Sequence, residues 1–506
     1  MSQTPTTPEA ATPPPPPAPA DPDGKLLSRV ALVVIIGALM PVLDATVVNV
    51  ALNTLSSDLS ASLPTIQWVV TAYLLSLAVV IPLSGWAMDR FGPKPVWIAS
   101  LLGFIVGSVL CGVAWNAGSL IAFRVLQGFG GGMIMPVAQT MMATVAGPKR
   151  MGRAMSLLGI AILLGPVLGP IVGGLLVEDA SWRWIFLINP PIGLLGVYLA
   201  YRLLPNLRAP RRSATLDLPG LALLSAALVA LLYGLSKASS AGGFSGGTVI
   251  GCLVTGGVLL VVFVLYSLRR GTKAIIDVAM YRNRVFSIAS LITLLLGVGM
   301  YGALLLLPLY YQVVRGEGTL KTGLLVVPMG LGAAVAMPVV GRIIDMIGSR
   351  IPMLVGLVLF LSGTLAFTQA GPDTSYVWLS LALFVSGVGL GCSTTPNMVA
   401  TYAALPPDAV PRASGAYNIL RQVGGSLGSA LLAITLTRNV NDVLPGSAAG
   451  GLHHIGSAQG GQRHVEELLG EAFRDTFWVA FGLTAVMLLP ALFLPNARRP
   501  ERPVAR

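Results

Sequence analysis

The chain of 506 residues is 54% hydrophobic and only 10% charged, whereas about 25% of the residues in soluble domains are charged. This composition excludes a soluble enzyme and predicts an all-α membrane protein. The net charge of +12 lies in short connectors between apolar stretches, with no basic stripe among stacking aromatic residues, so we expect no nucleic-acid partner.

Apolar stretches long enough to cross a bilayer recur along the chain. They follow residues 1–27, a proline-rich segment with too few apolar side chains to fold, which is predicted to be a disordered tail. The first stretch is too long for the core of a signal peptide and is therefore predicted to be a retained helix. We predict fourteen spans, near residues 28–51, 67–87, 95–115, 118–144, 152–177, 183–204, 216–236, 247–268, 286–313, 321–344, 351–370, 375–403, 412–437 and 474–495.

Positive charge indicates the orientation of these spans. Most of the 32 Lys and Arg residues fall on the side of the predicted membrane that holds both termini. Since cytoplasmic connectors retain Lys and Arg, we expect both termini to be cytoplasmic.

The first span contains Asp44, the only one of 20 acidic residues that lies near the centre of a predicted span. An acid at such a depth costs about 2.5–3.5 kcal/mol on insertion scales, so it should face a cavity or a partner, and desolvation should favour its protonated form. Asp44 is therefore a candidate for exchanging a proton against a substrate. The alternative is that Asp44 pairs with a buried Arg or hydroxyl group only to fix helix packing.

Two short connectors repeat the same pattern. A Gly, an Asp and a second Gly follow the second span, and the same residue types follow the tenth span at the same offsets, at Gly85, Asp89, Gly92 and Gly341, Asp345, Gly348. The spacing fits a tight turn between helices, in which the acid is able to cap a neighbouring helix N-terminus. A short cytoplasmic turn of any kind would look similar in one copy, but two matching copies indicate two related bundles.

Two arginines lie inside predicted spans, away from the span ends. Arg124 begins a glycine-rich stretch of the fourth span and needs an acceptor, which backbone carbonyls or Asp44 itself would supply. The alternative for Arg124 is a side chain that reaches the outer interface. Arg421, in the thirteenth span, lies nearer the cytoplasmic end, where we expect a structural or gating contact.

The fifth span packs four glycines and two prolines into residues 165–174. Such a helix is expected to be thin and kinked, and small residues let another helix approach closely. The segment is therefore predicted to act in packing, or as a pivot or seal between the bundles.

The sequence offers no site for a cofactor or a metal. Each cysteine lies in a different apolar segment, and the histidines share one polar loop, at Cys111, Cys252, Cys392 and His453, His454, His464 respectively. No phosphate-binding Gly-x-x-x-x-Gly-Lys-[Ser/Thr] loop occurs. We therefore expect a protein driven by the proton gradient rather than by ATP.

Together these stretches resemble the major facilitator superfamily, in particular its fourteen-helix drug:proton antiporter branch, the EmrB/QacA-like group. The segment Leu43–Leu52 is similar to the first-helix signature of that branch, Gly85–Lys94 resembles the conformational-switch loop, and the stretch at Arg124 looks like the proton-transfer motif. Residues 165–174 resemble the motif shared by antiporters. Pro93 stands where the switch loop usually carries a basic residue.

The resemblance implies a fold and a domain organisation. Two six-helix bundles, at residues 28–204 and 286–495, would flank two additional helices with linkers at 205–285. An outer loop is expected at 438–473 and a basic cytoplasmic tail at 496–506.

The resemblance also implies site residues. Proton coupling would involve Asp44 and Arg124. The conformational switch would use Gly85, Asp89, Arg90, Gly92, Lys94 and Asp345, and the antiporter-type helix Gly165, Pro166, Gly169, Pro170, Gly173 and Gly174. Substrate contacts are expected at Asp44, Gln127, Met133, Tyr301, Gln312, Asn397 and Asn418.

The function implied is proton-coupled export of amphiphilic small molecules or drugs by alternating access. With one buried acid and two buried arginines, we expect monocationic, zwitterionic or neutral compounds to be carried better than dications. The resemblance also implies a monomer in the lipid bilayer of a bacterial inner membrane. Two alternatives stay open: export of a lipid or an endogenous secreted metabolite on the same fold, and a membrane sensor that binds a ligand without transporting it.

Overall fold

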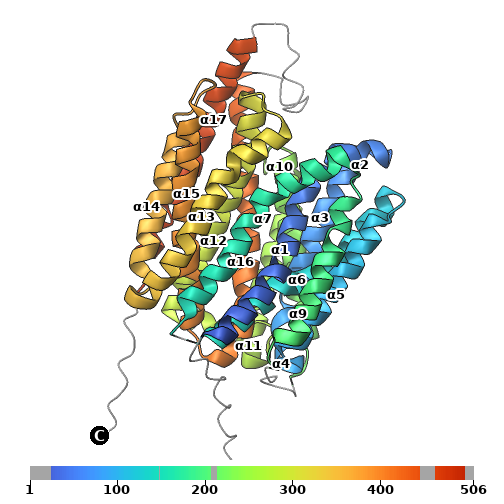
Figure 1. Cartoon of the computed structure of the whole chain (residues 1–506), viewed down its shortest axis with the longest axis vertical. Helices are drawn as coiled ribbons and strands as arrows, with labels where there is room; N and C mark the ends of the chain where they lie inside the picture. Colours follow the sequence, from blue (N-terminus) through green and yellow to red (C-terminus); the bar gives the residue numbers. More distant parts are fainter. Residues whose placement is uncertain (1–23, 148, 207–213, 445–461, 496–506) are drawn as a thin grey trace, which may run out of the picture.

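The computed structural model describes residues 24–147, 149–206, 214–444 and 462–495. The described residues form long helices that run side by side, with no strand among them. Helices of the first half of the chain lie on one side of the molecule in Figure 1, and helices of the second half lie on the other. The all-α membrane fold with two bundles is therefore confirmed.

The first bundle holds six of the predicted spans. It consists of α1 (Lys25–Val50), α2 (Leu52–Asp58), α3 (Leu63–Val80), α4 (Leu83–Phe91), α5 (Pro93–Gly112), α6 (Ala117–Ala146), α7 (Met151–Asp179), α8 (Trp184–Leu187) and α9 (Asn189–Leu203). The additional pair consists of α10 (Leu218–Ser240) and α11 (Gly247–Arg270), followed by the 3-10 turns η1 (Gly271–Lys273) and η2 (Val278–Arg282).

The second bundle repeats the six-span arrangement. It consists of α12 (Arg284–Leu309), the π-helix η3 (Tyr310–Val314), α13 (Thr319–Ile347), α14 (Arg350–Phe367), α15 (Tyr376–Ala403), the 3-10 turn η4 (Pro407–Ala409), α16 (Val410–Val443), α17 (Gln462–Ala485) and α18 (Leu488–Leu492). We use "basic end" for the end of the molecule where α1 begins at Lys25 and α16 begins at Val410, and "opposite end" for the other.

Among the described residues, thirteen stretches of helix are long and apolar enough to cross a membrane, and the pair α3 and α4, bent by 50°, supplies a fourteenth if it is counted as one span. The prediction of fourteen spans therefore agrees with the structure. The bend lies at the break between Val80 and Leu83, where Pro82 precedes α4. Because proline has no backbone N–H, it weakens the continuity of the helix there.

Helix ends differ from the predicted span ends around the expected outer loop. Residues up to Val443 belong to α16 and residues from Gln462 belong to α17, so helix replaces both flanks of the 438–473 segment. Hydropathy detects only the apolar part of a helix, whereas the polar continuation outside the bilayer keeps the same backbone hydrogen bonds. Residues 445–461, which include His453 and His454, lie outside the described residues, as do 1–23 and 496–506.

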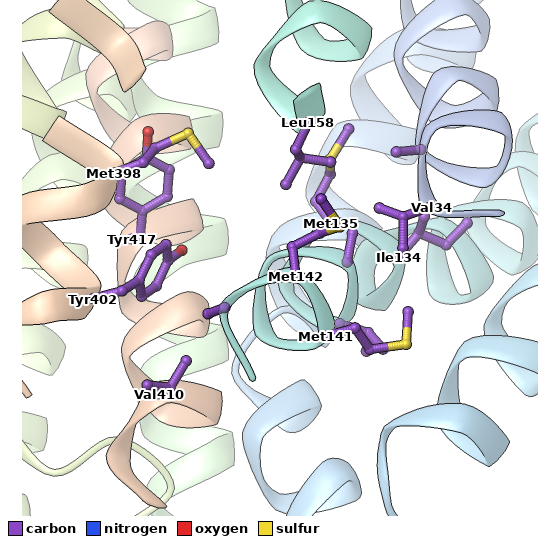
Figure 2. Packing of buried hydrophobic residues seen from close by; sticks show 14 of the residues in the cluster. Val34, Ile134, Met135, Met141, Met142, Leu158, Met398, Tyr402, Val410 and Tyr417 are labelled. Atoms are coloured by element: carbon purple, nitrogen blue, oxygen red, sulfur yellow. The ribbon is translucent and has the colours of Figure 1, made fainter. Parts of the chain in front are cut away.

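The two bundles meet along α7 and α13, which lie in contact from one end to the other. At the basic end, a Cβ placed on Gly152 would lie 2.3 Å from the Gly341 carbonyl oxygen, and near the opposite end a Cβ on Gly323 would lie 3.3 Å from Pro170. Glycine at these positions allows the two helices to approach closely. Methionine and tyrosine side chains pack near this seam, with Met398, Tyr402 and Tyr417 of the second bundle facing Met135 and Met142 of the first (Figure 2).

Candidate functional site

Asp44 lies in α1, six residues before the helix ends at Val50. Asp44 therefore lies past the midpoint of α1, in the half of the helix that is closer to the opposite end of the molecule. Its side chain has 0% exposure, and the segment around it packs against α7 and α6. A carboxylate in such a position needs compensating groups, because the surrounding apolar medium does not solvate its charge.

Three side chains bind the Asp44 carboxylate. Arg124 Nη1 donates to Oδ2 at 2.5 Å, Gln127 Nε2 donates to Oδ1 at 2.9 Å and Asn189 Nδ2 donates to Oδ1 at 3.2 Å. Both carboxylate oxygens are thus occupied by donors from α6 and α9. This arrangement fits an ionised carboxylate, since every partner donates a hydrogen bond to it.

Ser108 connects two of these donors through its hydroxyl group. Its hydroxyl accepts from Asn189 Nδ2 at 3.0 Å and from Gln127 Nε2 at 3.2 Å, and donates to the Phe186 carbonyl at 2.8 Å. Ser108 therefore orients the two amides that bind Asp44. We use "Asp44 site" for Asp44, Ser108, Arg124, Gln127 and Asn189.

Arg124 is fully buried and does not reach the outer interface, so the alternative of an interfacial side chain is wrong. Its Nε donates to the Val69 carbonyl at 3.1 Å and its Nη1 also donates to Gln127 Oε1 at 2.8 Å. The guanidinium lies over the Tyr73 ring, with 3.9 Å between its carbon and the ring centroid. An aromatic face stabilises a desolvated guanidinium, which suits Arg124 because its Nη2 has no hydrogen-bond partner.

The glycines of α7 bring that helix against the segment of α1 that carries Asp44. A Cβ on Gly165 would lie 2.2 Å from Val42, one on Gly169 would lie 2.0 Å from Thr46 and one on Gly173 would lie 3.1 Å from Val47. Gly174 does not take part in this contact, because a Cβ placed on it would have its nearest neighbour 3.9 Å away, in Leu320. α7 remains one helix through this segment, and its four-residue glycine spacing forms the contact with α1.

The two repeated connectors make reciprocal contacts between the bundles. Asp89 of α4 forms an ion pair with Arg412 of α16 at 3.0 Å. Asp345 of α13 accepts a hydrogen bond from the Gly152 amide at 2.8 Å, and a longer one of 3.4 Å from Arg153, at the first turn of α7. Each acid therefore binds a helix of the other bundle at the basic end, and Asp345 caps a helix N-terminus as the spacing allows.

The remaining switch-loop residues make different contacts in this conformation. A Cβ on Gly85 would lie 3.2 Å from the Arg412 side chain, and Gly92 has a φ of 87° at the turn into α5. Lys94 donates to the Tyr201 and Leu204 carbonyls at the end of α9, at 3.0 and 2.8 Å. Lys94 thus binds within its own bundle. Arg90 is exposed.

A polar cluster joins the bundles one to two turns inside the basic end. Tyr402 Oη and Asn418 Nδ2 both donate to Gln139 Oε1, at 2.9 and 2.6 Å, and the Thr140 and Ser414 hydroxyls lie 3.0 Å apart. We use "interbundle cluster" for these five residues. Together with the two acid contacts, the cluster holds the basic halves of the bundles together.

The expected substrate-contacting residues occupy different places. Gln127 belongs to the Asp44 site and Asn418 to the interbundle cluster, while Asn397 is buried and donates to Thr293 at 2.7 Å. The others, Met133, Tyr301 and Gln312, are partly exposed. Gln312 lies in η3 at the opposite end, whereas the interbundle cluster lies near the basic end.

Ser108, Asn189 and Tyr73 contribute to the site although the sequence assigned them no role. Asn189 begins α9 directly before two prolines, and an Asn inside an apolar segment is a signal of a buried hydrogen bond. Arg421, where we expected a structural or gating contact, makes no hydrogen bond or ion pair within the described ranges. No group of three His, Cys, Asp or Glu side chains with metal-binding geometry occurs among the residues described.

Comparisons with known proteins agree with this architecture. Residues 34–429 match the family model of the Major Facilitator Superfamily. The chain is 38% identical over 494 residues to a multidrug resistance protein B homolog of Mycobacterium tuberculosis, covering 94% of this chain and 91% of that protein. It is 30% identical over 409 residues to the multidrug export protein EmrB of Haemophilus influenzae, covering 81% and 80%.

The fold is also that of a solved transporter. The proton:xylose symporter XylE aligns with a TM-score of 0.64 at 14% identity, covering 94% of this chain and 97% of that one. With its two bundles and its family match over most of its length, the chain belongs to the Major Facilitator Superfamily and is an EmrB-like membrane transporter rather than an enzyme.

Proposed function

We propose that this protein exports amphiphilic, drug-like molecules in exchange for protons, by alternating access. The observation that carries the proposal is the Asp44 site, where one carboxylate buried in an apolar helix meets an arginine at 2.5 Å. Intramembrane acids of this kind mark ion and proton pathways. Export as the direction of transport is supported by the printed names of the two relatives, which describe multidrug resistance and multidrug export.

Proton binding at Asp44 would change the contacts that hold α1. A proton on Oδ2 removes the negative charge, and with it most of the attraction to Arg124. The bond to Arg124 then weakens and α1 is free to shift against α6. Because Gly169 packs on Thr46 and α7 packs on α13, a shift of α1 is transmitted toward the second bundle.

The cycle runs between two arrangements of the bundles. With the basic halves joined, Asp44 accepts a proton from the opposite side of the membrane. The ion pair of Asp89 with Arg412, the contact of Asp345 with α7 and the interbundle cluster then separate, and the substrate enters from the basic end as the proton leaves. A proton moving inward gains about 2.3 kcal/mol per 100 mV of membrane potential, and this free energy drives export.

Membrane placement follows from the same scheme. We propose that the basic end faces the cytoplasm of a bacterial cell with both termini inside, because connectors rich in Lys and Arg stay on that side. The substrate class is supported by the methionines and tyrosines on the facing surfaces of the bundles (Figure 2). Flexible, polarisable methionines adapt to ligands of varied shape. The scheme needs one chain, so we propose a monomer.

Proton release on substrate binding tests the proposal directly. Purified protein in weakly buffered detergent solution should release protons when a lipophilic cation such as ethidium is added, and Asp44→Asn should abolish this release while ethidium still binds. The matched control is Asp217→Asn, which changes another acid with 1% side-chain exposure that caps α10 at the basic end. Unchanged proton release from the Asp44→Asn variant would refute the role of Asp44, and ligand binding without ion flux in liposomes would indicate a sensor.

A further inference from the structure

The charges that lie inside the predicted spans, away from the span ends, do not balance. Asp44 and Arg124 neutralise each other, whereas Arg421 of α16 has no acid within ion-pair distance in the described part of the chain. The intramembrane charges therefore sum to plus one when Asp44 is ionised and to plus two when it is protonated. Arginines within membrane spans normally pair with an acid or a backbone carbonyl, so Arg421 lacks a partner that its position calls for.

Arg421 lies on the face of α16 that looks toward the first bundle. It follows Asn418 by three residues and Ser414 by seven, and residues with these spacings share one face of a helix. Asn418 and Ser414 contact Gln139 and Thr140 of α6, so this face is turned toward the first bundle. Arg421 is one turn beyond the interbundle cluster, toward the middle of the membrane, and is partly exposed.

Tyrosine residues lie near this position. Gly425 lies four residues further along the same face, and a Cβ placed there would lie 2.8 Å from the Tyr301 ring. Tyr417 lies four residues before Arg421 in α16, and its ring centroid lies 6.1 Å from that of Tyr402. Their hydroxyl and ring atoms are neutral and leave the guanidinium charge uncompensated.

We propose that Arg421 binds the anionic group of the exported molecule, so that the substrates include amphiphiles with a carboxylate or sulfonate. A guanidinium matches the planar geometry of such oxyanions through paired N–H donors. The ring of Tyr301 would contact the apolar part of the ligand. This inference rests on the proposed function for its transport step, but anion binding at Arg421 is measurable by itself.

Two dyes with one scaffold and opposite charge test the inference. Fluorescein is anionic and tetramethylrhodamine methyl ester is cationic, and both contain a xanthene ring system. Binding of each dye to purified protein in detergent is measured by fluorescence anisotropy for the wild type, Arg421→Gln and Arg421→Lys. The control is Arg474→Gln, which changes an arginine of α17 with 42% side-chain exposure that is paired with Glu471.

We expect Arg421→Gln to weaken fluorescein binding about tenfold or more, as the loss of one charge-assisted contact implies. Arg421→Lys should keep most of the affinity, and the rhodamine ester should bind Arg421→Gln as well as it binds the wild type. Arg474→Gln should bind both dyes normally. Equal losses for both dyes in Arg421→Gln, or no fluorescein binding to a wild type that binds the cation, would overturn the inference.

Transport assays separate this inference from the proposed function. In proteoliposomes with an imposed proton gradient, the wild type should move both dyes, and Arg421→Gln should lose fluorescein transport selectively. Anion binding that depends on Arg421, without proton-driven transport of either dye, would support the Arg421 site and contradict the exporter. Normal transport of fluorescein by Arg421→Gln would contradict the Arg421 site and support the exporter.

Discussion

The Asp44 site shows how a charge is accommodated inside an apolar bundle. Asp44 contacts an arginine and two amides, and Ser108 in turn orients the amides. Removing one partner of a buried ion pair leaves the other charge unsolvated, which costs about 3–5 kcal/mol, whereas removing both charges together costs far less. The energetics of the pair are therefore strongly non-additive.

Arg124→Gln is expected to lower the thermal stability of the detergent-solubilised protein, because the Asp44 carboxylate remains buried without its cation. We expect a loss of about 3–5 kcal/mol in the free energy of unfolding. In the double variant Asp44→Asn with Arg124→Gln, much of this loss should be recovered. Melting curves of the wild type, both single variants and the double variant measure the coupling. Strictly additive losses would contradict the importance of the pair.

At the scale of the element, α7 joins the proton site to the bundle interface. Three of its glycines contact α1 at Val42, Thr46 and Val47. The first turn of α7 binds Asp345, and α7 packs along α13 for most of its length. Because the α1 contacts are so close, a side chain at these glycines would push α1 away from α7. The glycine-rich segment is therefore suited both to packing and to transmitting a shift of α1.

Gly169→Ala is expected to impair both folding and transport, since the new Cβ would lie 2.0 Å from Thr46 Oγ1. Overpacking of this kind costs about 1–3 kcal/mol. Gly174→Ala is the matched control in the same helix, because its nearest neighbour would be 3.9 Å away. Thermal unfolding and dye efflux from cells expressing each variant give the comparison. Equal behaviour of the two alanine variants would argue against a specific contact of α7 with α1.

At the scale of the whole molecule, contacts at the basic end join the two bundles. The reciprocal contacts of Asp89 and Asp345 and the interbundle cluster all lie in the basic half, whereas the Asp44 site lies toward the opposite end. A proton site at one end and a closure at the other suit a transporter in which the two ends open in turn.

A disulfide across the closure should arrest this cycle. The Thr140 and Ser414 hydroxyl oxygens are 3.0 Å apart, so cysteines at these positions are placed for a bond between sulfurs. In a background without the native cysteines at 111, 252 and 392, oxidation of Thr140→Cys with Ser414→Cys should abolish transport, and a reductant should restore it. Each single cysteine variant serves as the control. Full transport by the cross-linked protein would rule out separation of the bundles at this point.

Composition and periodicity determined the large-scale features of this protein. Apolar stretches of the length of a bilayer predicted the spans, and the repeated Gly and Asp spacing indicated two related bundles. Asp44 stood out because an acid in an apolar helix is costly, and Arg124 because a guanidinium there needs an acceptor. These features follow from local composition, which is why the residues alone predict them.

Tertiary structure decided which side chains meet. Asn189 is 145 residues from Asp44 in the chain and begins α9, which the apolar pattern predicts only as a span. The contact between Asn189 and Asp44 forms because α9 packs beside α1. Likewise, only the packed structure shows that Lys94 binds the carbonyls at the end of α9. It also shows that Arg421, where we expected a structural or gating contact, makes no hydrogen bond or ion pair within the described residues. Hydropathy specifies which residues enter the membrane, whereas the rotation and packing of each helix determine which polar groups it brings together.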